Sequence, residues 1–334
     1  MSRFQRSIPP DSFEMKLLPS RSLTSRVSQL HFGKLAASTD RTEGSRTRPI
    51  AACNNTEVRY QETTYKTDDD AALYEQQWLP DGEPRAVVCL VHGHGEHSGR
   101  YNNVIDVLVD QQDLAVLSFD LRGHGKSSGT RGDLRFDDAM EDIDHLLVRA
   151  RTQFPNKPVI LYGHSLGGLL TMTYMLKRRP EVTAHVVTAP LLDTQLREQT
   201  VKVTLANVLG SALPGLTLGT GGDPTGISRD EAEVKAYIDD TMVHDKASFA
   251  FAKQSLAAMA KMQETTEYPV PLLMLHGTGD IWTIPAASRE FVERVDGDIT
   301  LYQYEDLYHE LHHELEKDQI LDDIAAWIND VLDD

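Results

Sequence analysis

The chain has very little cysteine, and its two cysteines are not placed for a bridge. Cys53 lies in a polar N-terminal segment and Cys89 in an apolar run. A disulfide-stapled fold is therefore excluded, and a reducing compartment suits the sequence. No cysteine or histidine falls into the spacing of a structural metal site. We expect no metal and no cofactor.

A long apolar run is also missing. The longest uncharged stretch, Val203–Gly222, contains Pro214 and several glycine, threonine and serine residues. A helix that spans a bilayer needs about 20 predominantly apolar residues in a row, so the sequence predicts no transmembrane helix. No internal repeat is visible either, which excludes solenoid and propeller folds.

Positive charge is scarce: 33 lysines and arginines face 51 acidic residues, giving a net charge of −18. A field of that sign repels polyanions, so we expect no nucleic-acid partner. Residues 1–55 have the opposite charge balance, with nine basic and four acidic residues. This leader segment is rich in serine and arginine and lacks the compact apolar stretch of a secretory signal.

Two interpretations of the leader segment stay open. The first is a disordered extension. The second is a transit peptide for a plastid or mitochondrion, favoured by the arginine and serine bias. In both cases the folded domain is residues 56–334. The first predicts a cytoplasmic protein and the second an organellar one.

From residue 58 onward, short apolar runs alternate with amphipathic stretches. Continuous apolar runs such as Ala86–Val91 are typical of strands buried on both faces. Strands are predicted at Val58–Lys66, Ala71–Leu79, Ala86–Val91, Leu114–Phe119, Pro158–Tyr162, His185–Thr188, Pro271–Leu275 and Ile299–Tyr304. Helices are predicted at Tyr101–Gln111, Phe136–Phe154, Leu166–Arg179, Pro285–Val295 and Lys317–Leu332. The alternation predicts parallel βαβ units with helices on both faces of the sheet.

The alternation is interrupted between about residues 191 and 263. This stretch is helical in pattern, rich in glycine and alanine, and shows no clear strand. We interpret it as a helical cap inserted into the α/β domain.

The main chemical signal is Gly163-His164-Ser165-Leu166-Gly167, a G-x-S-x-G that follows one predicted strand and opens a helix. In that context the serine sits on a sharp turn that exposes its hydroxyl above the sheet, while the glycines let neighbouring backbone pass. The helix N-terminus beside it favours developing negative charge. Ser165 is the predicted nucleophile.

A nucleophilic serine needs a base and a carboxylate that orients the base. Asp280 and His309 follow Ser165 in the chain order acid then histidine, each just past a predicted strand. We predict Asp280 as the acid and His309 as the base. Asp306 and Asp193 compete for the first role, and His312 and His313 for the second.

Two backbone amides should stabilise the oxyanion of an acyl-transfer reaction. One is that of Leu166, directly after the nucleophile. The other, by its position in the loop His92-Gly93-His94-Gly95, is that of His94. The later run Asp120–Ser127 lacks the spacing of a phosphate-binding loop, and we interpret it as a structural loop that supports the oxyanion strand.

These motifs together resemble a known family. The runs HGHGEHSGRY (92–101), DLRGHGKSSG (120–129), GHSLGG (163–168), HGTGD (276–280) and YHELHHE (308–314) are similar to those of the monoacylglycerol lipase and lysophospholipase group of α/β-hydrolases. The resemblance runs from Val58 to the C-terminus. It implies the α/β-hydrolase fold, with a mostly parallel sheet of eight strands and a helical cap.

The resemblance also implies a function: cleavage of monoacylglycerols to fatty acid and glycerol through an acyl-enzyme. A polar subsite for the glycerol head would fall on Glu96, Arg100 and His312. A simple helix-start ion pair explains Glu96 and Arg100 equally well, and His312 fits a surface histidine. The partner is then an acylglycerol or lysolipid, with transient membrane-surface contact through the cap.

Three functions remain open at this point. They are monoacylglycerol hydrolysis, a broader carboxylesterase or lysophospholipase activity, and ligand binding by a relative that kept the fold without the chemistry.

Overall fold

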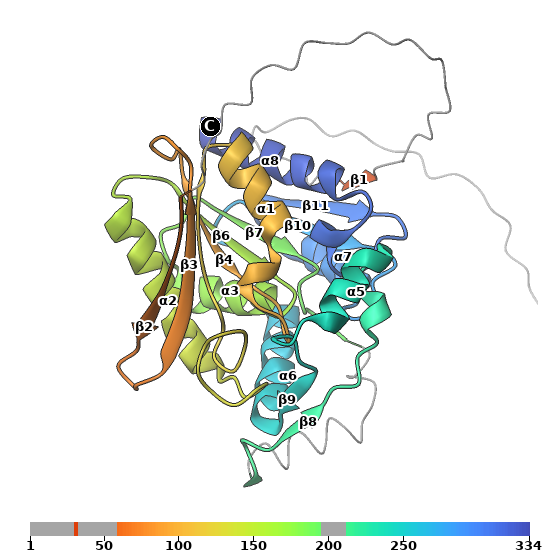
Figure 1. The fold of residues 1–334 in the computed structure, drawn as a ribbon. Coiled ribbons are helices and arrows are strands. Elements are labelled where there is room, and N and C mark those ends of the chain that lie inside the picture. Colours follow the sequence, from red (N-terminus) through yellow and green to blue (C-terminus); the bar gives the residue numbers. More distant parts are fainter. Residues whose placement is uncertain (1–29, 33–58, 195–211) are drawn as a thin grey trace, which may run out of the picture.

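The computed structural model describes residues 30–32, 59–194 and 212–334 (Figure 1). Its centre is a nine-stranded sheet in the order β1-β11-β10-β7-β6-β4-β5-β3-β2. The pairs β2–β3 and β3–β5 are antiparallel and the others parallel. The strands are β1 Leu30–Phe32, β2 Arg59–Lys66, β3 Ala72–Leu79, β4 Val87–Val91, β5 Ala115–Phe119, β6 Val159–His164, β7 Ala184–Thr188, β10 Leu272–Gly277 and β11 Ile299–Tyr304. The mostly parallel α/β prediction is confirmed.

Eight of these strands were expected, and one was not. Leu30–Phe32 runs parallel to β11 and pairs with Leu301–Gln303, although it lies in the leader segment that the sequence interpretation left out of the fold. An edge strand offers unpaired backbone groups to any extended segment that can reach it. Because such pairing uses only the backbone, side-chain patterns gave no sign of it. The rest of the leader lies outside the described residues.

Helices cover the sheet on two sides (Figure 1). They are α1 Asn102–Ile105, continued by the π-helix η2 Asp106–Gln111, then α2 Phe136–Gln153, α3 Leu166–Arg178, α5 Glu231–Asp239, α6 Phe249–Glu264, α7 Pro285–Arg294 and α8 Lys317–Asp333. One apolar cluster joins the sheet to α1, η2 and α8. The other joins it to α2, α3, α6 and α7. Within the described chain, none of the helices combines the length and apolar character needed to cross a bilayer.

The core is apolar around β4. Cys89 on that strand is fully buried, and burial raises the pKa of its thiol to about 12. Its side chain faces α2, with the sulfur 4.0 Å from the carbonyl oxygen of Leu146. The thiol therefore behaves as a small apolar packing group.

The stretch between residues 191 and 263 differs from its prediction in one respect. It contains two short strands, β8 Thr217–Gly219 and β9 Lys246–Ser248, paired antiparallel, where no strand was expected. Three residues are too few for an alternating pattern to be readable. α5 lies between them in the chain. α6 contributes Phe251 and Met259 to the core cluster shared with α2 and α3. Residues 195–211 lie outside the described part.

Candidate active site

Ser165 sits on the turn between β6 and α3, in a backbone conformation that few side-chain-bearing residues adopt. Its φ of 53° and ψ of −114° are held by three backbone hydrogen bonds: its amide donates to the carbonyl of Thr188 (2.9 Å), and its carbonyl accepts from the amides of Leu191 (3.0 Å) and Leu169 (3.1 Å). The turn also needs its glycines. A Cβ on Gly167 would overlap the carbonyl oxygen of Val91, and one on Gly163 would overlap the hydroxyl of Thr171. The expected elbow is present.

The structure brings together the three residues nominated from the sequence. The Ser165 hydroxyl lies 2.9 Å from Nε2 of His309, and Nδ1 of His309 lies 2.7 Å from Oδ2 of Asp280. All three residues are buried. Asp306 instead occupies a turn with φ of 61°.

Asp280 is held by a set of donors that the sequence reasoning missed. Its Oδ1 accepts from the amides of Trp282 (2.7 Å) and Thr283 (3.0 Å), and its Oδ2 also accepts from the Thr283 hydroxyl (2.7 Å). His276, at the end of β10, lies 3.2 Å from Oδ2 through Nε2 and 2.8 Å from the Ser288 hydroxyl through Nδ1. His276 belongs to the HGTGD motif, so the sequence did contain a signal for this contact with Asp280.

The contact between His309 and Asp280 shifts the pKa of each residue against the effect of burial. Burial by itself lowers the pKa of His309, but the charge and hydrogen bond of Asp280 outweigh it, so that the pKa lies above its ordinary 6.5. Burial by itself raises the pKa of Asp280, yet His309 and His276 hold it well below 3.8. Asp280 is therefore ionised at neutral pH and fixes the Nδ1–H tautomer of His309.

The predicted oxyanion loop lies directly beside Ser165, the predicted nucleophile. A Cβ added to Gly93 would stand 3.3 Å from Cβ of Ser165, so the backbone of Gly93 passes close to the Ser165 side chain. The loop is tied to the run 120–127, where the amide of Leu121 donates to His92 (2.9 Å). Asp120 accepts from the amides of Ser98 (2.9 Å) and Lys126 (2.8 Å). The run is thus a structural support.

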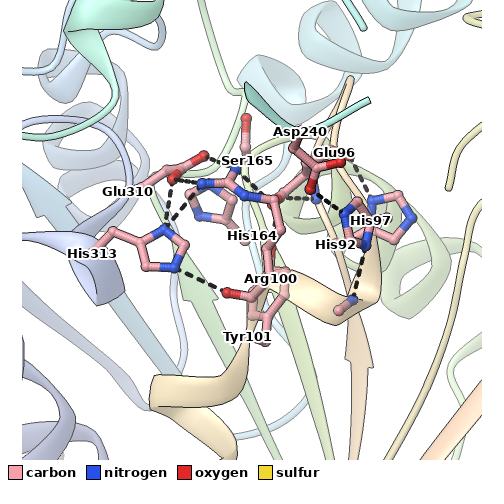
Figure 2. Close-up of polar contacts among 12 residues, drawn as sticks. His92, Glu96, His97, Arg100, Tyr101, His164, Ser165, Asp240, Glu310 and His313 are labelled. Atoms are coloured by element: carbon pink, nitrogen blue, oxygen red, sulfur yellow. Dashed lines mark hydrogen bonds and ion pairs between the residues drawn. The ribbon is translucent and has the colours of Figure 1, made fainter. Parts of the chain in front are cut away.

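Two of the three residues assigned to a glycerol subsite are engaged in a buried network (Figure 2). Oε1 of Glu96 accepts from the Gly93 amide and the Tyr101 hydroxyl, each at 2.7 Å. Arg100 binds Glu310 with two nitrogens, at 2.7 and 2.8 Å, and meets Glu96 only at 3.5 Å. The helix-start ion pair exists, but the close partner of Arg100 is Glu310, which no sequence pattern indicated.

His312 is different, because its side chain is buried without polar contacts. Its ring stacks on Tyr101 with the ring centroids 4.7 Å apart. Neither ring nitrogen meets a hydrogen-bond partner among the described residues. His312 is thus no surface histidine. It is a buried polar group whose hydrogen bonds are still available.

One group of side chains has the composition of a metal site. Donor atoms of Glu310, His312 and His313 lie within 4.8 Å of one another. However, the Glu310 carboxylate already neutralises Arg100, and His313 is bound to Glu310 (2.7 Å) and to the Arg100 carbonyl (2.9 Å). A cation here would meet a guanidinium and two occupied ligands, so the group fits an ion-pair network better than a metal centre.

A nucleophile elbow followed by an acid and a histidine at successive strand ends is the arrangement of serine hydrolases of the α/β-hydrolase class. Comparison with known proteins agrees. The profile of the Hydrolase_4 family, described as serine aminopeptidase, S33, matches residues 82–316.

Relatives narrow the class further. A monoacylglycerol lipase of Mycolicibacterium smegmatis is 36% identical over 75% of this chain and 90% of its own. The crystal structure of the Paleococcus ferrophilus monoacylglycerol lipase superposes with a TM-score of 0.71 at 34% identity, covering 78% of this chain and 98% of that one. An uncharacterized abhydrolase domain-containing protein of Dictyostelium discoideum is 37% identical over 79% of this chain. The matched region makes up only 28% of the length of the Dictyostelium protein.

The chain therefore belongs to the Hydrolase_4 family and, within it, to the monoacylglycerol lipase group of carboxylic ester hydrolases.

Proposed function

We propose that the protein hydrolyses monoacylglycerols to a fatty acid and glycerol, with Ser165, His309 and Asp280 as its catalytic triad. The observation that carries the proposal is the continuous chain of contacts from the Ser165 hydroxyl through His309 to the ionised Asp280. Similarity to monoacylglycerol lipases over most of the chain supports the choice of substrate.

In the proposed reaction, Ser165 attacks the ester carbonyl while Nε2 of His309 takes its proton. The amides of His94 and Leu166 stabilise the oxyanion. The tetrahedral intermediate collapses, the protonated His309 gives its proton to the leaving glycerol, and an acyl-enzyme remains. Water, deprotonated by His309, then releases the fatty acid.

Selection of the glycerol head is proposed to rest on the region of Glu96, Arg100 and His312, with His312 making the direct contact. The reason is its two buried ring nitrogens, which have no hydrogen-bond partner in the described part of the chain; Glu96 and Arg100 are largely occupied by Gly93, Tyr101 and Glu310. His312→Ala should lower kcat/KM for a monoacylglycerol about 2- to 12-fold, the value of one hydrogen bond. A nitrophenyl ester of the same acyl chain is the control. Equal loss with both esters would contradict the assignment.

The decisive experiment for the function is a panel of acylglycerols, lysophospholipids and short esters, combined with a fluorophosphonate probe. Labelling of Ser165 and highest kcat/KM on monoacylglycerols are expected. Labelling without a head-group preference would favour a broader carboxylesterase or lysophospholipase. Absence of both labelling and turnover would favour a ligand-binding relative.

We also propose that the cap touches lipid surfaces transiently. Leu213, Leu216 and Leu218 are each about half exposed, at 52%, 47% and 53%, and apolar side chains in that state can enter a membrane interface. The proposed location is the cytoplasm, or a plastid or mitochondrion if residues 1–55 act as a transit peptide. Expression of this segment fused to a fluorescent protein separates these locations.

A further inference from the structure

Trp282 contacts both the acid and the base of the proposed triad. Its amide donates to Oδ1 of Asp280 (2.7 Å), and its half-buried indole lies across the face of the His309 ring. The two ring centroids are 5.6 Å apart and the planes are 22° from parallel, the geometry of an offset stack. The stack covers a face of the imidazole and leaves both of its nitrogens free for Ser165 and Asp280.

The other edge of the same indole meets the segment before α5. Its Nε1–H donates to the carbonyl of Asp223 (3.0 Å). A Cβ on Gly226 would stand 3.0 Å from Nε1, and one on Gly222 would stand 3.4 Å from the ring, so glycines allow this close approach. Tyr237 on α5 meets the indole edge-on at 6.3 Å.

We propose that Trp282 is a positioning residue that couples the cap to the base: the ring keeps the His309 imidazole in the plane of Ser165 and Asp280, and the indole N–H holds the cap segment Asp223–Gly226 over it. The inference rests on the proposed role of His309. A hydrogen bond at one edge and a stack on one face make the orientation of the base depend on the position of the cap.

The kinetic test separates the two contacts by substitution. Trp282→Leu removes both the stack and the N–H. Trp282→Phe keeps an aromatic face and removes only the N–H. We expect Trp282→Leu to lower kcat for a short, soluble ester about 2- to 12-fold, the range for an aromatic pair, with KM nearly unchanged. Trp282→Phe should recover most of that loss. Trp327→Phe, on α8, is the matched control.

Hydrogen exchange tests the contact with the cap without using activity. In Trp282→Phe, the amides of Asp223 and of residues 225–227 should exchange about 2- to 12-fold faster, because one hydrogen bond closing the segment is lost. Exchange in α8 should not change. Thermal unfolding checks that both variants fold. If Trp282→Leu does not fold, the exchange measurement on Trp282→Phe still tests the contact.

Indole emission supplies a third measurement. Protonated imidazole quenches a stacked indole, so the difference in emission between wild type and Trp282→Phe should titrate with pH and lose that titration in His309→Gln. The charged or titratable groups that face His309 are Asp280, His276, His164, Glu96 and Glu310. Their own variants identify any other source of the titration.

The outcomes are distinct from failure of the proposed function. Fluorophosphonate labelling of Ser165 with unchanged kcat in Trp282→Leu would overturn the inference and leave the hydrolase intact. Unchanged exchange at residues 223–227 in Trp282→Phe would likewise overturn it. Absence of labelling in the wild type would overturn the hydrolase itself, whereas the emission and exchange results would still report the contacts of Trp282.

Discussion

At the scale of single residues, the strained backbone of Ser165 is held from several sides. Ser165 keeps its positive φ because its amide and carbonyl are both bonded to β7 and the residues after it. Strained backbone of this kind persists only where the surroundings over-determine it. The serine hydroxyl itself contributes one contact, to His309, so the chemistry and the stability of the turn are separable.

The first prediction follows from that separation. Ser165→Ala should lower kcat by about 10⁶-fold, as removal of a triad nucleophile does elsewhere, while the melting temperature stays within a few degrees because the backbone bonds remain. Steady-state kinetics and thermal unfolding check this. Substantial residual turnover in a preparation free of contaminating esterase would remove Ser165 from the mechanism.

The second prediction concerns pH. His309 accepts a proton only when neutral, so activity falls as the pH drops through its pKa. Since Asp280, Glu310 and Glu96 raise that pKa against the effect of burial, the acid limb of kcat/KM should lie above pH 6.5.

The substitution Glu310→Gln tests whether Glu310 raises the pKa of His309. The substitution removes a negative charge that raises the pKa of His309 and leaves Arg100 without its close partner. Both effects favour neutral imidazole, so the acid limb should move to lower pH. A pH profile of kcat/KM for both proteins measures the shift. An unmoved limb would mean that Glu310 acts only through structure.

At the scale of elements, patterns in the sequence were enough to predict eight of the nine strands and the convergence of Ser165, Asp280 and His309. Apolar runs of five or six residues identify buried strands, and Ser165, Asp280 and His309 each follow one of them. The carboxyl ends of parallel strands meet at one edge. Their convergence therefore follows from local sequence and topology.

The features that the sequence did not predict depend on contacts between distant segments. The bidentate contact of Arg100 joins it to Glu310, 210 residues away, and no spacing rule reports such a pair. The three-residue strands β1, β8 and β9 are too short for a periodic signal. No pattern in the sequence indicated that Trp282 would stack on His309.

The third prediction belongs to the segment around β8. Replacing Leu213 and Leu216 by Ser should weaken binding to phospholipid vesicles, because both are about half exposed and their apolar area would no longer enter the interface. Hydrolysis of a soluble short-chain ester should change much less. Vesicle co-sedimentation and ester kinetics measure the two effects. If both fell together, these leucines would serve to hold the cap in place.

At the scale of the whole molecule, charge is divided unevenly. The net charge is −18, yet residues 1–55 carry +5, which leaves −23 on the remainder. A protein body of that sign is repelled by anionic surfaces and attracts neither polyanions nor acidic lipid.

The fourth prediction follows. At low salt the protein should bind zwitterionic vesicles more tightly than vesicles rich in anionic lipid. The difference should shrink at 1 M salt, where the screening length falls to about 3 Å. Co-sedimentation across a salt series measures it. Tighter binding to anionic vesicles would mean that the basic leader segment, rather than the cap, makes the first contact.

The burial of Cys89 makes site-specific labelling straightforward. Its thiol is buried, and burial keeps it protonated far above neutral pH. Maleimides will therefore not react with it in the folded protein. With Cys53 changed to serine, a single cysteine placed at Asp223 would carry a fluorophore or spin label on the cap alone. The environment and mobility of the cap segment would then be reported by that label alone, with no background from Cys89.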